Sequence, residues 1–398
     1  MISERLRKVA PSQTQAIDAK AKLMIKDGVD LVGFGLGESD FDTPENIKEA
    51  GISAIRANKS RYTPVSGIPE LKAAVAEKLK RENGFDYKPS DIIVSCGAKH
   101  SLYNIFMALL NPGDEVIIFS PYWVSYEEQV KIADGVPVIV QLDESRNFEI
   151  DFDLLENRVT PKTRAMVVNS PSNPTGAVLS EDSLAKLAEI ALKNNLVIIS
   201  DEIYEHFLFT GEKHVSIASF SKEVKAQTII VNGVSKTYAM TGWRIGYLAS
   251  ENRQIVTAID NLQSHATSNP TSIAQWAALE ALKNTPESVV QAMAAEFDKR
   301  RRHIMKRLDG IPQLTYVRSE GAFYIYPNFT PVLGKTIRGK VINGSLDFAE
   351  MLLNEAKVAV VPGIAFGTDR HFRLSYATSM ANIDKGLDRI AEVLKSAC

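Results

Sequence analysis

Cysteine is scarce in this 398-residue sequence, which contains only two. Cys96 lies in an apolar stretch and Cys398 is the last residue, so the chain offers no disulfide framework. The six histidines are scattered, and none stands at metal-ligand spacing with a cysteine or a second histidine. We therefore expect a cytoplasmic protein without a structural metal.

Long apolar runs and a charge imbalance are also missing. No stretch approaches the roughly 18 apolar residues that span a membrane, and the opening segment "MISERLRKVA" lacks the apolar core of a signal peptide. The formal charge of −2 gives no electrostatic reason to expect a nucleic acid or an anionic membrane as partner. The one dense basic run, residues 298–307, has a helical pattern that indicates a solvated helix face.

The chain does contain a regular alternation of short apolar runs and helical segments, from about residue 45 to 285. The runs are continuously apolar, as strands covered on both faces of a sheet should be. This pattern predicts an α/β fold with a mostly parallel sheet. Six such runs lie at residues 91–95, 114–120, 164–170, 196–200, 228–235 and 244–250.

The pattern changes after residue 285, where a long charged helix leads into mixed strands and helices. We expect two domains, on a prior of about 150 residues each. Residues 45–285 form the predicted large domain, and residues 1–44 with 286–398 form a smaller α+β domain. The N-terminal segment is assigned to the small domain because residues 34–44 read as a crossing loop rather than a sheet strand.

Polar residues follow four of the apolar runs at the point where each run ends. They are Gly97, Ala98 and Lys99 after the first run, Asn173 after the third, Asp201 and Tyr204 after the fourth, and Lys236 after the fifth. Ligands of open α/β sheets bind beyond the carboxyl ends of the strands. The sequence therefore predicts one site at this edge of the sheet.

This set of residue types suits one cofactor. A lysine amine forms a Schiff base with an aldehyde, and a carboxylate holds a heterocyclic nitrogen protonated so that the ring draws electrons. A helix N-terminus with a nearby arginine holds a phosphate, and an aromatic side chain stacks on a flat ring. Together these features describe a site for pyridoxal 5′-phosphate.

Over essentially its whole length the sequence resembles the class I aminotransferases of the fold-type I pyridoxal-phosphate enzymes. It is most similar to the bacterial aspartate aminotransferases, a subgroup that includes aromatic and prephenate transaminases. His100 departs from the glutamine that this subgroup commonly has. The resemblance rests on "GLGESDFDTP", "RYTPVSGIPELK", "GAKHSLYN", "NPGDEV", "SPYWVSY", "NSPSNPTGAV", "SDEIYEH", "SKTYAMTGWRIGY", "EGAFY" and "FRLSYATS".

The resemblance implies a seven-stranded sheet and a homodimer with shared active sites. It also implies a ping-pong transfer of the amino group between L-aspartate, or a related dicarboxylic amino acid, and 2-oxoglutarate. Lys236 would be the Schiff-base lysine and proton shuttle, Asp201 the partner of the pyridine nitrogen, and Tyr204 and Asn173 the partners of the phenolic oxygen. The alternatives are a solvated loop lysine, a helix N-cap for Asp201 and an ordinary Asn-Pro turn.

The resemblance also assigns the phosphate and the substrate. Trp123 would stack on the cofactor ring, unless it is a core tryptophan, and Tyr62 would reach the phosphate of the neighbouring subunit. The substrate α-carboxylate would meet the Arg373 guanidinium and the Gly37 amide, and the distal carboxylate would meet Lys99, whose alternative role is phosphate neutralisation. The phosphate itself would be held by Arg244, Ser235 and the backbone amides of Gly97, Ala98 and Lys99.

Other functions compete with this interpretation. Residues 33–40, "GFGLGESD", lack the G-x-G-x-x-G spacing of a dinucleotide site. No residues remain for the helix-turn-helix domain of an aminotransferase-like transcription regulator. A pyridoxal-phosphate lyase would share Lys236, Asp201 and Arg244, so that alternative stays open, as does an aromatic or prephenate aminotransferase.

Overall fold

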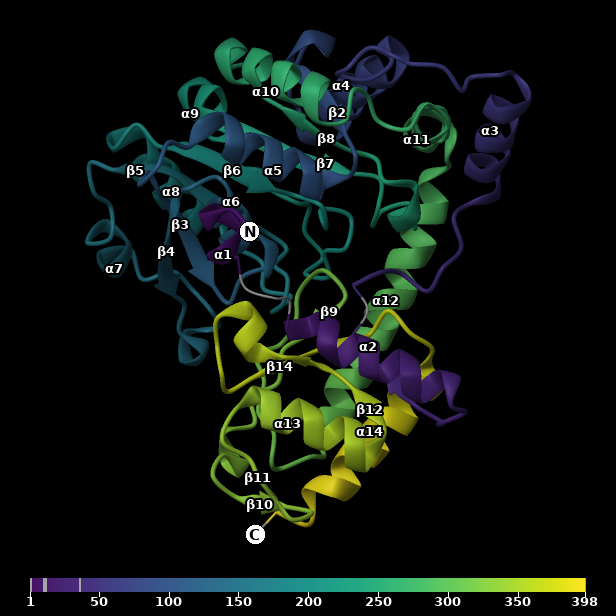
Figure 1. Ribbon diagram of the computed structural model, residues 1–398, viewed down its shortest axis with the longest axis vertical. Helices are drawn as coiled ribbons and strands as arrows, with labels where there is room; N and C mark the ends of the chain where they lie inside the picture. The colour runs from purple at the N-terminus through teal and green to yellow at the C-terminus, as the bar shows by residue number, and fades with distance from the viewer. Residues whose placement is uncertain (1, 10–12, 36, 398) are drawn as a thin grey trace.

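The computed structural model describes residues 2–9, 13–35 and 37–397. Figure 1 shows a larger part built around a sheet and a smaller part below it. The long helix α12 (Glu287–Leu308) runs from the larger part into the smaller one. In the described part of the chain, no helix has the length and apolar character needed to cross a membrane.

The central sheet has seven strands in the order β2-β8-β7-β6-β5-β3-β4. All neighbouring strands are parallel except β8, which is antiparallel to both β2 and β7. The predicted mostly parallel α/β sheet is therefore confirmed. The strands are β2 (Ile92–Ser95), β3 (Glu115–Ser120), β4 (Val136–Gln141), β5 (Thr163–Asn169), β6 (Val197–Asp201), β7 (Thr228–Gly233) and β8 (Gly246–Ala249).

Strand β4 is the one that the apolar runs did not reveal. It lies at the edge of the sheet, its first residue Val136 is exposed, and it contains Pro137. A proline cannot donate to a neighbouring strand, so it is tolerated at an edge, and Pro137 argues against a strand in a stretch that is otherwise apolar.

Helices cover both faces of the sheet, which explains the continuously apolar runs. Val116 and Ile118 of β3 belong to a core shared with α5 and α6, whereas Ile117 between them packs in a core shared with α8. Alternate residues of a strand point to opposite faces, so both sets are buried. The covering helices are α4 (Pro69–Asn83), α5 (Ala98–Leu109), α6 (Ser125–Ile132), α8 (Glu181–Lys193), α9 (Lys222–Gln227), α10 (Arg253–Ala266) and α11 (Ser272–Asn284).

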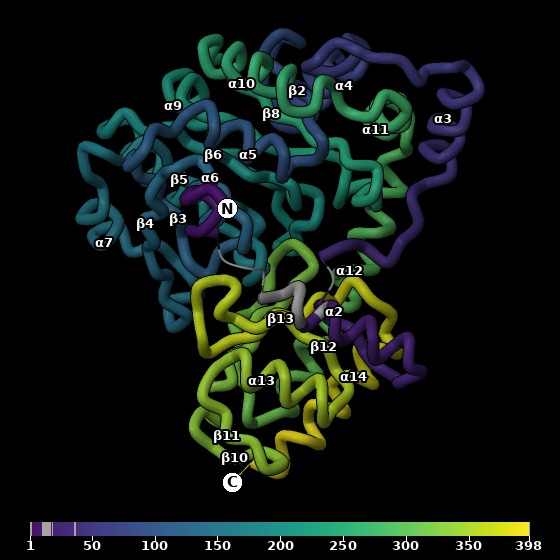
Figure 2. The backbone as a smooth tube through the Cα atoms, viewed as in Figure 1, coloured from purple at the N-terminus to yellow at the C-terminus, as the bar shows by residue number. Residues whose placement is uncertain are grey.

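The smaller part contains a three-stranded antiparallel sheet in the order β13-β14-β9, with α13 and α14 beside it. Strand β1 (Val32–Gly33) pairs in parallel with β12 (Val358–Ala359), so the N-terminal segment lies with the C-terminal residues. Figure 2 shows α2 (Gln13–Lys26) beside β12 and β13 as well. The other elements here are β9 (Tyr324–Ile325), β10 (Thr336–Ile337), β11 (Lys340–Val341), β13 (Val361–Pro362), β14 (Phe372–Ser375), α13 (Ser345–Met351) and α14 (Met380–Leu394).

The division of the chain into residues 45–285 and residues 1–44 with 286–398 stays a prediction. Helix α3 (Glu45–Arg56) begins directly after the crossing segment and packs against α11. The remaining short helices are α1 (Glu4–Arg7) and α7 (Phe152–Glu156).

Candidate active site

Strand β8 runs antiparallel to its neighbours β2 and β7. Residues before its first residue therefore lie at the same edge of the sheet as residues after the last residues of the parallel strands. Lys236 follows β7, and Arg244 precedes β8, so one connection between antiparallel strands carries both. Asp201 is the last residue of β6, the neighbour of β7. The carboxyl edge of the sheet therefore brings together a lysine, an arginine and a carboxylate, as the sequence predicted.

Lys236 places its amine in an enclosed position. Its Nζ donates a hydrogen bond of 2.5 Å to the backbone oxygen of Gly37 and lies 6.0 Å from the ring centre of Tyr204 and 5.9 Å from that of Phe323. Burial and the nearby Arg373 guanidinium lower the pKa of Lys236 to about 8. A substantial fraction of the amine is therefore unprotonated near neutral pH and able to act as a nucleophile or base.

Asp201 is buried, with 4% of its surface exposed. The Tyr126 hydroxyl donates to its Oδ2 at 2.6 Å, and the Ile203 amide donates to its Oδ1 at 3.3 Å. Burial raises the pKa of Asp201 to about 6, against the lowering effect of the Tyr126 hydrogen bond. A buried carboxylate without an ion-pair partner among the described residues is suited to a cationic group of a ligand.

Two tyrosines and an asparagine complete this side of the site. The hydroxyls of Tyr204 and Tyr324 are 2.8 Å apart, and both side chains are buried. The Asn169 amide group donates to the Asp201 carbonyl at 3.0 Å, and its oxygen accepts from the Asn173 backbone amide at 3.0 Å. Asn169 therefore fixes the Asn173 loop against the end of β6.

Arg373 of β14 reaches this edge from the smaller part of the molecule. Its guanidinium donates to the Asn173 side-chain oxygen at 2.9 Å and to the Gly35 carbonyl at 2.8 Å, and it lies over the Tyr324 ring at 4.4 Å. The side chain is 6% exposed, and its Nε has no hydrogen-bond partner among the described residues. A buried guanidinium held by neutral oxygens retains the capacity to bind a carboxylate.

Gly37 lies at the same point. A Cβ atom at this position would stand 3.1 Å from the Tyr324 hydroxyl and 4.0 Å from an Arg373 nitrogen. A side chain here would crowd the space in front of the guanidinium, so the bare backbone is favoured.

The beginning of α5 forms a cradle with Arg244. Gly97 precedes the helix with a φ of 89°, and a Cβ atom on it would collide with the Arg244 guanidinium. Arg244 donates to the carbonyl of Thr241 at 2.8 Å and to that of Cys96 at 3.3 Å, and its side chain is exposed.

The cradle has the chemistry of an anion site. The amides of Ala98 and Lys99 belong to the first turn of α5 and have no acceptor within the helix. Ser235, next to Lys236, is buried. Helix amides, a hydroxyl and a guanidinium suit a phosphate group.

Lys99 and Trp123 are neighbours beside this cradle. The Lys99 Nζ lies 4.8 Å from the centre of the Trp123 ring, and that ring meets Tyr126 edge to face at 5.3 Å. Burial, together with the Arg244 charge, lowers the pKa of Lys99. Lys99 makes no ion pair with a carboxylate among the described residues, so its charge is available to an anionic ligand.

Tyr62 is the one predicted site residue that the chain does not bring to the others. Its side chain is 90% exposed, on the loop between α3 and α4. The loop is well anchored, because Gln275 donates to the Thr63 hydroxyl at 3.1 Å and Gln263 donates to the Val65 carbonyl at 2.7 Å. A rigid loop thus presents an exposed tyrosine to the surroundings.

Three residues that shape the site were not predicted from the sequence: Tyr126, Asn169 and Tyr324. All three lie in motifs already quoted, "SPYWVSY", "NSPSNPTGAV" and "EGAFY". Their contacts join segments far apart in the chain, which spacing alone does not reveal.

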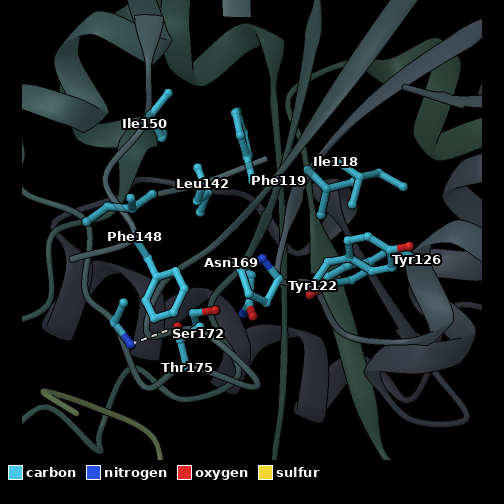
Figure 3. Close-up of a pocket in the computed structure, with 14 residues that line it drawn as sticks. Ile118, Phe119, Tyr122, Tyr126, Leu142, Phe148, Ile150, Asn169, Ser172 and Thr175 are labelled. Carbon is cyan, nitrogen blue, oxygen red and sulfur yellow. Dashed lines mark hydrogen bonds between the residues drawn. The ribbon is translucent and has the colours of Figure 1, made fainter. Parts of the chain in front are cut away.

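Figure 3 shows the side chains that line a small cavity, among them Tyr126 and Asn169 of the site described above. Its volume is about 40 Å³, and its lining includes Ile118, Phe148 and Leu179 together with Tyr126 and Asn169. A volume of this size is close to the roughly 30 Å³ that one water molecule occupies.

Comparisons with known proteins agree with this geometry. The family model "Aminotransferase class I and II" matches residues 29–390. The chain is 48% identical over 395 residues to an aspartate aminotransferase of Bacillus sp. (strain YM-2), covering 99% of both chains. It is also 48% identical to a probable aspartate/prephenate aminotransferase of Aquifex aeolicus (strain VF5), covering 99% of this chain and 98% of the other.

Solved structures give the same result. The aspartate aminotransferase of Rhizobium meliloti superimposes with a TM-score of 0.96 at 42% identity, covering 100% of both chains. That of Thermus thermophilus with maleate superimposes with a TM-score of 0.93 at 43% identity, covering 99% of both. Since family, fold and sequence agree over nearly the whole length, the chain belongs to the class I and II aminotransferases, with the fold-type I α/β architecture.

Proposed function

We propose that this protein is a pyridoxal-phosphate-dependent aspartate aminotransferase. It would move the amino group of L-aspartate, or a related dicarboxylic amino acid, to 2-oxoglutarate in a ping-pong reaction. The observation that carries the proposal is that one edge of the sheet brings together the Lys236 amine, the buried Asp201 carboxylate and Arg373, an arginine held by neutral oxygens. The names of the relatives at 46–48% identity support the substrate.

The residues at the sheet edge fit the cofactor. The cradle of Gly97 and Arg244, where a Cβ atom would collide, suits a phosphate. The Arg373 Nε, buried without a partner among the described residues, suits an additional acceptor. When bound, pyridoxal phosphate supplies an aldehyde that reacts with amines and a ring that accepts the electron pair released at the substrate Cα.

The cofactor-holding roles follow from these positions. Lys236 would bond the aldehyde, Asp201 would pair with the ring nitrogen, and Tyr204 and Asn173 would donate to the phenolic oxygen. Trp123 would cover the ring. The phosphate would be held by Ser235, Arg244 and the amides of Gly97, Ala98 and Lys99.

The chain's own residues would then perform the proton transfer and the binding steps. With pyridoxal phosphate bound, the Lys236 amine would accept the proton from the substrate Cα and give it up again, and a pKa of about 8 is suited to both roles near neutral pH. Asp201, oriented by Tyr126, keeps a negative charge beside the ring nitrogen throughout. Arg373 and the Gly37 amide bind the substrate α-carboxylate and so orient the Cα–H bond.

The preference for an acidic substrate is assigned to Lys99. Its ammonium lies beside Trp123 with no carboxylate partner in the part of the chain that the structure describes. A substrate carboxylate at this point would gain a charge-assisted hydrogen bond. The second candidate function, an aromatic or prephenate aminotransferase, is favoured by the Trp123 ring at the same place and by the name of the Aquifex relative.

The proposal includes a homodimer with shared sites. The anchored loop 57–68 would place Tyr62 at the phosphate of the partner subunit, which accounts for a tyrosine that is 90% exposed in the single chain. Residues 45–285 would form the cofactor domain, and residues 1–44 with 286–398 the smaller domain that carries Arg373.

A transamination screen tests the proposal. The purified protein with pyridoxal phosphate is offered aspartate, glutamate, phenylalanine, tyrosine and alanine as donors, with 2-oxoglutarate as acceptor, or oxaloacetate where glutamate is the donor. Fast transfer from aspartate is expected. Addition of a 2-oxo acid to the amine form should return the spectrum of the aldehyde form, which a lyase would not require. Product formation from aspartate without any use of the 2-oxo acid would contradict the proposal and favour a lyase.

A further inference from the structure

A buried ionic cluster lies directly behind the turn that carries Asp201 and Tyr204. In residues 201–205, these two side chains contact Tyr126 and Tyr324, whereas Glu202 and Glu205 enter a different environment. We call this environment the Lys78 cluster, and define it as Lys78, Glu82, Glu202, Glu205, His206 and His214.

Lys78 stands at the centre of the cluster. It belongs to α4 and is 2% exposed. Its Nζ donates to Glu205 at 2.5 Å and to the Asn83 side-chain oxygen at 3.0 Å, and it lies 3.3 Å from a Glu82 oxygen. The same Glu205 oxygen accepts from the Asn232 amide group of β7 at 2.6 Å. One ammonium and one carboxylate thus tie α4, the 201–205 turn and β7 together.

Glu202 anchors the other half of the turn. It is 1% exposed and accepts hydroxyl hydrogen bonds from Ser200 at 2.8 Å and Ser216 at 2.5 Å. The His214 Nε2 lies 3.2 Å from its Oε2. Burial opposes protonation of His214, but the Glu202 carboxylate outweighs burial and raises the pKa of that imidazole. The Glu205 amide donates to the Glu202 carbonyl at 3.0 Å, which closes the turn.

The energetic character of the cluster argues against a purely stabilising role. Burying an ion pair costs several kcal/mol of hydration, and a well-packed apolar pair is often equally stable. Charges, unlike apolar groups, make directional contacts, and the hydrogen bonds to Glu202 and Glu205 fix atoms of the 201–205 turn. Glu202 also acts through space, because its charge contributes to the raised pKa of Asp201.

We propose that Lys78 and Glu205 are positioning residues for the proposed aminotransferase reaction, holding the 201–205 turn so that Asp201 and Tyr204 face the cofactor. This inference rests on the proposed function. Loss of the Lys78–Glu205 ion pair should allow residues 201–205 to shift. Displacements of about 1 Å at a reacting group can lower turnover by up to about a hundredfold.

The test compares Lys78→Met, Glu205→Gln and the double variant in the cofactor-loaded protein. Each single variant leaves one member of the buried Lys78–Glu205 pair without its partner, whereas the double variant removes both members and leaves Glu82 beside His206, so its free energy of unfolding should recover. Lys80→Met is the matched control, because Lys80 lies on the same helix with an exposed ion pair to Asp86. The readouts are unfolding temperature, kcat and KM for aspartate, and the pH midpoint of the visible absorption band of the lysine-linked cofactor.

A positioning role predicts that the double variant regains its unfolding temperature but not its activity. Its kcat should stay about tenfold low with KM changed less than about twofold, and its spectral midpoint should differ from wild type by about half a pH unit, because Asp201 and Tyr204 tune the cofactor. Wild-type kcat and midpoint in the double variant would overturn the inference and leave the cluster with a structural role alone. A wild-type protein without the band or without amino transfer would overturn the proposed function and this role with it.

Discussion

The Tyr126 hydroxyl donates a hydrogen bond of 2.6 Å to the Asp201 carboxylate inside the protein, where both side chains are almost fully buried. Hydrogen bonding favours the ionised carboxyl group, and burial opposes it. The result is a pKa of about 6, so Asp201 is mostly ionised at pH 7. The Asp201 carboxylate is therefore already negatively charged in the protein without a bound cationic ring.

Asp201→Asn should retain the cofactor but lose turnover. An amide cannot stabilise the positive ring nitrogen, and loss of one such electrostatic contact lowers kcat by about 10²–10³-fold. Tyr126→Phe removes one hydrogen bond and keeps the charge, so we expect a smaller loss, about tenfold. Steady-state kinetics with cofactor content measured by absorbance checks both. Equal losses in the two variants would mean that the charge of Asp201 is not the decisive feature.

Lys236→Ala should bind cofactor without the visible band of the lysine-linked form. Amino transfer should fall by about 10⁴-fold or more, because both the covalent link and the proton transfer are lost. Single-turnover measurements at saturating aspartate give the residual rate. Turnover near that of wild type would remove Lys236 from the reaction.

The pH dependence of cofactor capture should report the environment of Lys236. The unprotonated amine reacts with the aldehyde, so the capture rate of the cofactor-free protein should rise with pH and level off above about 8, the pKa of Lys236. Arg373→Met removes a nearby cation, which favours the ammonium form and should move the midpoint to higher pH. Stopped-flow absorbance measures the rate, and Arg253→Met, an exposed arginine on α10, serves as the control. An unchanged midpoint in Arg373→Met would show that the Arg373 charge does not contribute to this pKa.

Lys99→Ala should discriminate among substrates. A charge-assisted contact to the distal carboxylate contributes about 1.5–3 kcal/mol, or about ten- to a hundredfold in kcat/KM. The loss should appear with aspartate and glutamate and be much smaller with phenylalanine or alanine. Losses of the same size for every donor, with weaker cofactor binding, would assign Lys99 to the phosphate.

Tyr62→Ala should be complemented by Lys236→Ala if Tyr62 serves the neighbouring subunit. In mixed dimers one site contains both an intact Tyr62 and an intact Lys236, so an equal mixture should regain about a quarter of the wild-type sites. Activity is measured at limiting cofactor, after subunit exchange has been demonstrated with differently tagged chains. A mixture that stays as inactive as its components would indicate that Tyr62 acts within its own chain.

The parts of the fold that could be predicted are those with a strong local signal. The central strands are apolar on both faces, and the polar residues at their ends mark the site because parallel strands share one carboxyl edge. Strand β4 was not predicted because Pro137 argues against a strand, although the residues around it are apolar. The reversal of β8 is likewise invisible in its own composition, yet it decides where Arg244 lies.

Contacts between distant segments could not be predicted from spacing. In the sequence, nothing distinguishes Tyr126 from the other aromatic residues near Trp123. Its hydrogen bond goes to Asp201, which lies 75 residues away in the chain. The Lys78 cluster could not be predicted from the sequence either. Glutamates and lysines are usually exposed, and no local pattern shows that Lys78 and Glu205 are buried together.

The separation of these contacts along the chain also bears on how the site forms during folding. Lys236 and Arg244 lie on one connection between adjacent antiparallel strands, so that half of the site closes a short loop. The bond between Arg373 and Asn173 joins residues 200 positions apart and requires the C-terminal strands to be in place. Contacts of high sequence separation form slowly. A chain emerging from the ribosome would therefore form the connection that carries Lys236 and Arg244 well before Arg373 completes the site that recognises a substrate.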